Sequence, residues 1–186
     1  MSRLFVEDTP LAGVKLVRRH QLADDRGALS RLFCSDELQA AGWTGPVAQI
    51  NHTITHQRGT LRGMHYQSPP DAECKLVTCI RGAVWDVALD LRAGSSTLLQ
   101  WHAALLSADN LAAMLLPEGV AHGFQAMTDD VELIYCHSRA HAQESERGVN
   151  PMDRRVAIRW PLAVGVMSER DRSFAPLDSL FAGVPA

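Results

Sequence analysis

The feature that most constrains the fold of this chain is the short interval at which turn-forming residues recur. Between the turns lie apolar stretches of about strand length, at residues 47–54, 75–80, 84–91, 114–116 and 133–136. The turns fall at residues 24–27, 57–59, 68–70, 81–82, 93–95, 117–119 and 128–130. Short strands separated in this way are typical of an antiparallel sandwich or small barrel. The sequence therefore predicts an all-β fold.

Residues 84–91 show the alternation of a half-buried strand. Apolar side chains occupy positions 85, 87, 89 and 91, whereas Asp86 and Asp90 have the other parity. Because successive side chains of a strand point to opposite faces, we expect a strand with one wetter face.

Helix is expected only at the periphery. Residues 35–42 read SDELQAAG, with Ser35 as N-cap, acidic residues in the first turn and Gly42 as terminator. The tail from residue 161 is loop-like, with a short helix around residues 176–181. A length of 186 residues without internal repeats suits one domain, 1–186, with its core at about residues 25–160.

The composition indicates which binding partners and which cellular compartment suit this chain. Hydrophobic residues make up 46% and charged residues 21%, enough for an ordinary core. A net charge of -3 gives no general attraction for nucleic acid or an anionic membrane, so anion recognition must be local. Four cysteines without a CxxC pair indicate buried thiols in a reducing compartment. With no signal-peptide run and no apolar span, we expect a cytoplasmic protein.

The segment TLRGMHYQ, residues 60–67, has the composition of a strand but contains two basic side chains, Arg62 and His65. Strict alternation would send Arg62 and His65 to opposite faces. Gly63 is a suitable place for a bulge that brings both into one cavity. The alternative is a buried histidine with satisfied hydrogen bonds and an arginine at the edge.

Eight histidines raise the question of a metal site. A metal-binding jelly roll usually offers an HxH pair followed by a carboxylate. In a pair that began with His65, the second histidine would be residue 67, which is a glutamine here. His52 and His56 are four residues apart on a strand, and His122 stands alone. We expect no metal.

Three other residues are unusual for their surroundings. Lys75 begins the apolar stretch KLVTCI, and Tyr135 lies within ELIYC, where a buried phenol needs a hydrogen-bond partner. Each has a structural alternative, as a lysine that reaches the rim or a tyrosine that fills the core. Asp171, from its local sequence alone, is a surface acid.

Taken together, several segments resemble the dTDP-4-dehydrorhamnose 3,5-epimerase family. They are QINHTITHQRGTLRGMHYQ, KLVTCIRGAVWDVALDLR, PEGVAHGFQAM, and IRWP with MSERD, in order from about Asp25 to Asp171. The resemblance implies a cupin-type jelly roll, a homodimer, a nucleotide diphosphate sugar as substrate, and neither metal nor organic cofactor. It also implies that residues 161–186 complete the active site.

The resemblance further implies residue roles. His65 matches the catalytic base, Asp171 the acid that orients it, and Tyr135 the acid on the other sugar face. Lys75 and Arg62 match basic residues near the substrate. Other matched substrate-contacting positions are Arg26, which would contact the nucleotide diphosphate, and Gln49, Asn51 and His122.

These roles agree with the chemistry of a 4-keto sugar. Its C3 and C5 protons are acidic because both carbons adjoin the C4 carbonyl, and histidine is a suitable base near neutral pH. A carboxylate fixes the tautomer of the histidine, and Lys75 could stabilise the enolate. Inversion requires a proton from the opposite face, which Tyr135 could give.

Three departures from the family pattern concern the nucleotide end or the lid of the pocket. After the DxRG segment, Leu29 replaces an aromatic residue and Arg31 an acid, and His141 stands where many members have a second tyrosine. Residues 146–153 lack the usual tryptophan. Arg31 and His141 are therefore counted with the substrate-binding candidates, and the nucleotide stays open.

The sequence leaves several functions to weigh. The leading one is epimerisation at C3 and C5; an epimerase acting at only one carbon, or on another nucleotide sugar, would have the same residues. A non-catalytic sugar-nucleotide-binding cupin would not need the His65–Asp171 pair. A metal-dependent cupin oxygenase is disfavoured by Gln67.

Overall fold

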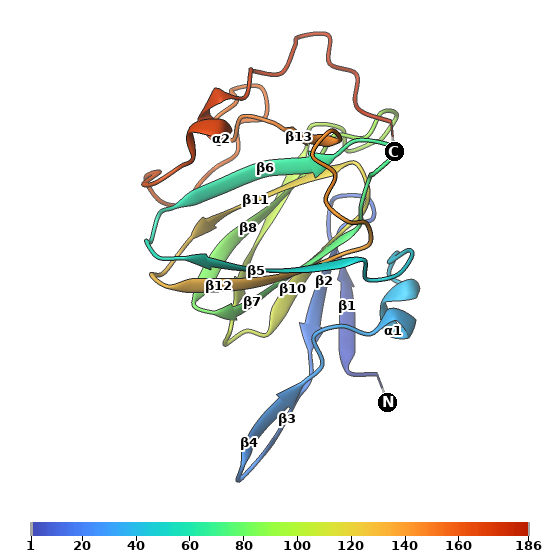
Figure 1. Cartoon of the computed structure of the whole chain (residues 1–186), viewed down its shortest axis with the longest axis vertical. Helices are drawn as coiled ribbons and strands as arrows, with labels where there is room; N and C mark the ends of the chain where they lie inside the picture. The colour runs from blue at the N-terminus through green and yellow to red at the C-terminus, as the bar shows by residue number, and fades with distance from the viewer. Residues whose placement is uncertain (1, 186) are drawn as a thin grey trace.

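Two antiparallel sheets make up the body of the molecule (Figure 1), which is a computed structural model that describes residues 2–185. Within these residues, the six-stranded sheet has the order β1 (Leu4–Asp8), β2 (Lys15–Arg19), β10 (Ala112–Leu116), β7 (Lys75–Arg81), β12 (Val131–His137) and β5 (Gln49–Thr55). The five-stranded sheet has the order β13 (Glu146–Gly148), β6 (Leu61–Gln67), β11 (Val120–Ala126), β8 (Ala83–Asp90) and β9 (Trp101–Ser107). The predicted antiparallel sandwich is confirmed.

The main core lies between the two sheets. Inward-facing side chains of both sheets form one cluster of buried residues, which includes Val77, Met114 and Leu133 from one sheet and Ala88 and Phe124 from the other. Alternation along each strand sends these residues inward. These side chains fill one part of the space between the sheets, and a cavity remains next to them.

The acidic face of β8 is not wet, so that part of the prediction is wrong. Asp86 and Asp90 are both fully buried, as are Val87 and Leu89 on the other parity. The reason is that β8 lies inside its sheet and is covered on both faces, one by the opposite sheet and the other by the C-terminal part of the chain. The carboxylates are hydrogen-bonded instead of solvated, with Asp86 bonded to His122.

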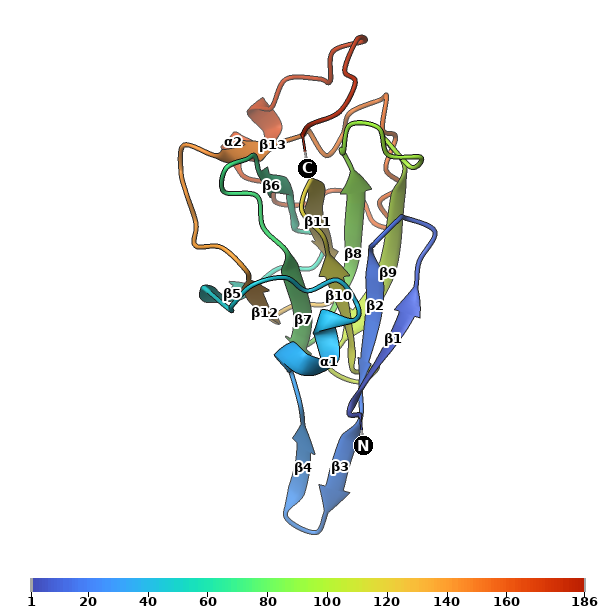
Figure 2. The same cartoon turned by 90° about the vertical axis from the view of Figure 1, so that its right-hand side faces the viewer.

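Residues 150–185 cover the outer face of the five-stranded sheet. Their apolar side chains pack against Met64, Val87 and Leu89, and Val184 forms a bridge with Arg92. In Figure 2 this segment runs over the end of the molecule that also holds β6 and β13. The packing fixes the position of α2 (Glu169–Ser173) beside β6.

The helices differ from the prediction. Helix α1 (Ser35–Gln39) has Cys34, not Ser35, at its N-cap, and Gly42 lies beyond its end at φ +105°. Leu38 buries its whole side chain against the six-stranded sheet, which contributes about 1.5–3 kcal/mol. The expected helix at residues 176–181 is absent from the described chain, because the Asp153 carboxylate accepts a hydrogen bond from the Leu177 amide and holds the segment in a loop.

Strands β3 (Gln21–Asp24) and β4 (Gly27–Ser30) form a hairpin that pairs with neither large sheet. Figures 1 and 2 both show it extending away from the body. No helix among residues 2–185 is long and apolar enough to cross a membrane.

Candidate active site

A cavity of about 570 Å³ lies between the two sheets, next to the core. Its walls come from β5, β7 and β12 on one side and from β6 and β11 on the other, and α2 and the residues before it contribute to the rim. The predicted site residues that line it are Gln49, Asn51, Arg62, His65, Lys75, His122, Tyr135, His141 and Asp171. The fold thus brings nine of the candidates together.

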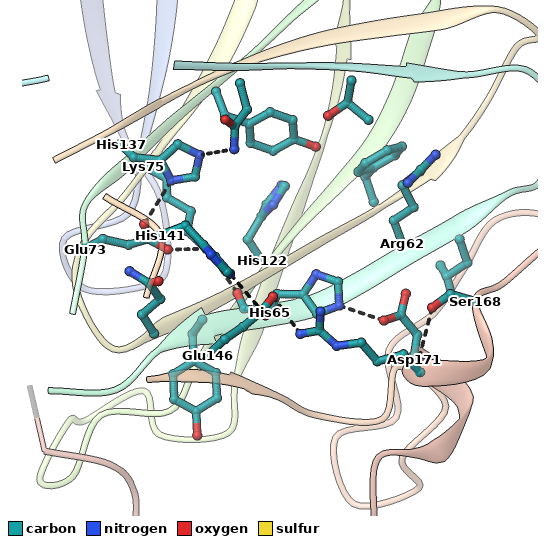
Figure 3. Close-up of a pocket in the computed structure, with 18 of the residues that line it drawn as sticks. Arg62, His65, Glu73, Lys75, His122, His137, His141, Glu146, Ser168 and Asp171 are labelled. Carbon is teal, nitrogen blue, oxygen red and sulfur yellow. Dashed lines mark hydrogen bonds and ion pairs between the residues drawn. The ribbon is translucent and has the colours of Figure 1, made fainter. Parts of the chain in front are cut away.

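His65 and Asp171 form a close pair although they are 106 positions apart in the chain. The His65 Nε2 atom lies 2.7 Å from Asp171 Oδ1 (Figure 3), and Asp171 Oδ2 accepts a hydrogen bond from the Gly63 amide at 3.3 Å. Ser168 holds the start of α2 by accepting from the Asp171 amide at 3.0 Å. Within residues 2–185, the other ring nitrogen of His65, Nδ1, has no hydrogen-bond partner, and His65 lines the cavity.

The Asp171 carboxylate is buried, with its side chain 4% exposed. Burial alone would raise its pKa, but the hydrogen bond and charge of His65, with the bonds from Gly63 and Ser168, lower it below the ordinary value. Asp171 therefore stays ionised and can stabilise a positive charge on His65.

A bulge at Gly63 explains how Arg62 and His65 reach the same cavity. His65 pairs with His122 and Arg62 with Phe124, so β6 contains one residue more than β11 across this stretch. Gly63 has φ +122°, and a Cβ atom there would lie 2.4 Å from the Cα of Gly123. The predicted bulge is confirmed.

Arg62 is held at the rim by two contacts with β5. Its Nε donates to Thr55 Oγ1 at 3.1 Å, and one terminal nitrogen donates to the Ile54 carbonyl at 3.3 Å. These bonds orient the guanidinium without neutralising it, which suits contact with an anion.

Tyr135 faces the cavity from the sheet opposite to that of His65. Burial, followed by the negative charge of Asp86, raises the pKa of its phenol well above the ordinary value. Next to it, at 5.7 Å between ring centres, lies His122, whose Nε2 is 2.7 Å from Asp86 Oδ1. The phenol is therefore protonated at neutral pH, where it carries a proton to donate and cannot act as a base.

Lys75 is buried in the wall and paired with Glu73. The Lys75 Nζ atom lies 2.9 Å from Glu73 Oε1, and it also donates to the His65 carbonyl at 3.4 Å. His137 Nδ1 is 2.9 Å from the second Glu73 oxygen (Figure 3). Sequence reasoning missed Glu73 and His137, although each lies two residues from a candidate and so shares its face of the strand pattern.

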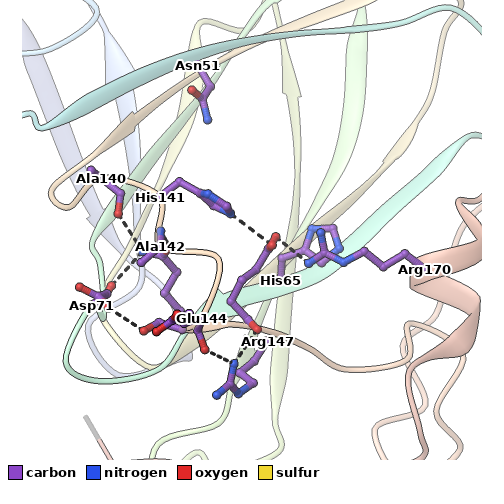
Figure 4. A network of polar contacts seen from close by, with 12 residues as sticks. Asn51, His65, Asp71, Ala140, His141, Ala142, Glu144, Arg147 and Arg170 are labelled. Atoms are coloured by element: carbon purple, nitrogen blue, oxygen red, sulfur yellow. Dashed lines mark hydrogen bonds and ion pairs between the residues drawn. The ribbon is translucent and has the colours of Figure 1, made fainter.

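A second group of ion pairs crosses the mouth of the cavity. Glu146 lies 3.2 Å from His141 Nε2 and 2.6 Å from Arg170, which neighbours Asp171 on α2. Figure 4 shows His141 and Arg170 on the two sides of this group. Burial would raise the pKa of Glu146, but the hydrogen bonds from Arg170 and His141 lower it. Glu146 and Arg170 carried no sequence signal, because their contact depends on how α2 docks.

Arg26 and Arg31 do not line this cavity within their own chain. Arg26 is at the tip of the β3–β4 hairpin, 90% exposed and 2.6 Å from Asp24. Arg31 follows the hairpin and pairs with Glu37 of α1. Within residues 2–185, no cluster of three or more His, Cys, Asp or Glu side chains is arranged to hold a metal ion.

Comparisons with known proteins agree on one family. The model of the dTDP-4-dehydrorhamnose 3,5-epimerase family matches residues 8–179. The dTDP-4-dehydrorhamnose 3,5-epimerase of Streptomyces griseus is 39% identical over 162 residues, which are 86% of this chain and 80% of that protein. The dTDP-4-dehydrorhamnose 3-epimerase of Streptomyces niveus is 37% identical, over 87% of this chain and 78% of that protein.

A solved structure extends the agreement to the fold. The dTDP-6-deoxy-D-glucose-3,5-epimerase of Legionella pneumophila, in complex with dTDP-4-keto-L-rhamnose, has a TM-score of 0.90 and 30% identity, covering 98% of this chain and 97% of that chain. The expected cupin-type jelly roll and the expected enzyme class are confirmed. The chain belongs to the dTDP-4-dehydrorhamnose 3,5-epimerase family and is a sugar-nucleotide epimerase.

Proposed function

We propose that this enzyme converts dTDP-4-dehydro-6-deoxy-glucose to dTDP-4-dehydrorhamnose by inverting C3 and C5. The observation that carries the proposal is the His65–Asp171 pair in a cavity that Tyr135 faces from the opposite sheet. The dTDP-linked sugar is supported by the ligand of the Legionella pneumophila structure. Arg62 contacts the phosphates or sugar oxygens.

In the proposed mechanism, His65 Nδ1 removes the proton from C3 or C5. The electron pair of that C–H bond moves toward the C4 carbonyl, whose oxygen becomes an enolate that accepts a hydrogen bond from Lys75. Asp171 stabilises the imidazolium through Nε2. The carbon then takes the proton of Tyr135 on its other face, and exchange with solvent restores both side chains.

These steps use side chains of this chain alone. Gln49, Asn51, His122 and His141 line the same cavity and hold the sugar and its neighbours in this proposal. His141, which replaces a tyrosine of the family pattern, contributes an imidazole bonded to Glu146 in place of a phenol.

We place Arg26 in the active site of a second copy of the chain, in a homodimer. The β3–β4 hairpin has no sheet partner in its own chain and exposes Leu22 and Leu29, which are 42% and 62% accessible. An isolated two-stranded hairpin is at best marginally stable in water, so a covering surface is needed. A second copy would supply it, and Arg26 at the tip would then reach the nucleotide diphosphate bound to the partner.

The same proposal includes a cytoplasmic location. The four cysteines are free, three of them buried, as is usual in a reducing compartment.

Epimerisation at C3 alone is the second candidate. It is favoured by the likeness to the 3-epimerase of Streptomyces niveus, at an identity close to that of the 3,5-epimerase of Streptomyces griseus. The residues that perform the first proton transfer would be the same in both reactions.

One experiment tests both candidates. The wild-type protein is incubated with dTDP-4-keto-6-deoxyglucose in deuterated water, and the deuterium is located by NMR. Deuterium at C3 and C5 supports the double epimerase, and deuterium at C3 alone supports the second candidate. No incorporation at either carbon would refute the proposed substrate.

A further inference from the structure

A continuous row of hydrogen bonds runs along the cavity wall from the loop after β12 to Lys75. The His141 amide lies 2.9 Å from Gln49 Oε1, and Gln49 Nε2 lies 3.0 Å from Asn51 Oδ1. Asn51 Nδ2 is 3.4 Å from His137 Nε2, and His137 Nδ1 is 2.9 Å from Glu73. The row ends where Glu73 meets the Lys75 ammonium.

The direction of every bond in this row follows from one backbone amide. The amide of residue 141 can only donate, so Gln49 must present its oxygen to it and its NH₂ group to Asn51. Asn51 then accepts with its oxygen and turns its own NH₂ group toward His137 Nε2. That ring nitrogen must accept, so the proton of a neutral His137 is on Nδ1, where it is donated to Glu73.

Glu73 is thereby held as a buried anion between two donors. Its side chain is 6% exposed. Burial would raise its pKa, but the hydrogen bond from His137 and the charge of Lys75 lower it below the ordinary value. A buried carboxylate with both oxygens occupied is a fixed counter-charge, not a proton carrier.

This counter-charge determines what Lys75 can do. One N–H of the ammonium goes to Glu73 and another to the His65 carbonyl, which leaves the third for a ligand in the cavity. Without an anion beside it, an ammonium in so buried a place would lose its proton more readily.

We propose that Glu73 and His137 are positioning residues of the reaction, which keep Lys75 protonated and direct its free N–H at the C4 oxygen of the substrate. This inference rests on the proposed function, in which Lys75 stabilises the enolate. His137 acts through Glu73, and its Nδ1–H tautomer is set by the row of amides from residue 141.

Other charged or titratable groups line the same cavity as Lys75. They come from β6, β11, β12, β13, α2 and the loop before β13, and are Arg62, His65, Tyr66, His122, Tyr135, His141, Glu146, Arg170 and Asp171. Within residues 2–185, Glu73 is the carboxylate paired with the Lys75 ammonium.

The variant E73Q tests the inference, since glutamine keeps the shape and removes the charge. We expect kcat near pH 8 to fall by about 10- to 100-fold, because one donor to a developing oxyanion is worth about 100- to 1,000-fold. KM should change little. The loss of activity on the alkaline side should begin at lower pH than in the wild type, and acidification should restore part of the rate.

The control is E132Q. Like Glu73, Glu132 is bonded to one histidine and one basic residue, but it lies on the outer face of the same sheet. Glu132 lies 3.0 Å from His52 and 3.3 Å from Arg81, and does not line the cavity. Its rate and pH profile should equal those of the wild type. An E73Q enzyme with an unchanged profile, or with an equal loss at every pH, would overturn the inference.

A second measurement needs no folded variant at position 73. NMR of the histidine ring nitrogens in the wild type at neutral pH should show His137 with its proton on Nδ1, the signal being assigned by its loss in H137N. A proton on Nε2 would overturn the inference. If the wild type incorporates deuterium into the substrate while these tests fail, only the inference is wrong; if it incorporates none, the proposed function is wrong.

Discussion

Of the two residues in the His65–Asp171 pair, only His65 could be recognised from its local sequence. The strand context and neighbouring glycine of His65 marked it as a candidate, and the bulge follows from Gly63. Asp171 had only the family resemblance to support it, because its local sequence is that of a surface acid. Its burial depends on the docking of α2, which no local pattern encodes.

Asp90 provides a prediction at the same scale. Its carboxylate accepts hydrogen bonds from Arg92, Ser95 and Thr97, and although burial raises its pKa, these bonds lower it to about 2 from 3.8. Since the folded-state pKa is depressed, its stabilising contribution is full above pH 3.8 and is lost as the pH falls toward 2.

The wild type should therefore lose part of its free energy of unfolding across this pH window, and D90N should lose less. Urea unfolding at a series of pH values measures this. Equal pH dependence for the two proteins would show that the bonds to Asp90 do not have the expected effect.

Among the elements, the strands were easier to predict than their surroundings. Five apolar stretches correspond to β5, β7, β8, β10 and β12. The wet face expected for β8 was wrong, because its acids lie on the face that the opposite sheet covers, where Asp86 is bonded to His122. The helix expected at residues 176–181 was wrong as well, since the Leu177 amide donates to the distant Asp153 carboxylate and the segment is a loop.

Strand β6 should tolerate no side chain at its bulge. In G63A, the new Cβ would meet the Gly123 backbone at 2.4 Å, whereas in G27A, at a similar φ of +129°, it would meet nothing within 4 Å. We expect G63A to be less stable than G27A by about 2 kcal/mol, the cost of overpacking beyond shared backbone strain. Thermal unfolding of both variants compares them, and equal melting temperatures would contradict the close packing of β6 on β11.

At the scale of the whole molecule, the alternating patterns and turn spacing predict the sandwich but not the hairpin. Arg26 and Arg31 resembled substrate-binding residues, yet one lies on an arm that leaves the body and the other pairs with Glu37. A single sequence cannot show which surface receives an arm, since that surface would belong to another copy.

Mixed dimers test the proposed exchange. R26A and H65A should each be nearly inactive alone. When they are unfolded and refolded together, activity should return, because a mixed dimer has one cavity with His65 from one protomer and Arg26 from its partner. Wild-type protein that is unfolded and refolded in the same way gives the activity that an intact dimer recovers. Mixtures no more active than the separate variants would place Arg26 outside the partner's site.

The most direct test of the central claim separates proton removal from proton return. The variants H65N and Y135F are each incubated with dTDP-4-keto-6-deoxyglucose in deuterated water, after nucleotide binding has been confirmed. Y135F should place deuterium at C3 with retained configuration, because His65 can return a deuteron to the face from which it took the proton, whereas H65N should place none. Incorporation by H65N at the wild-type rate would contradict the assignment of His65 as the base.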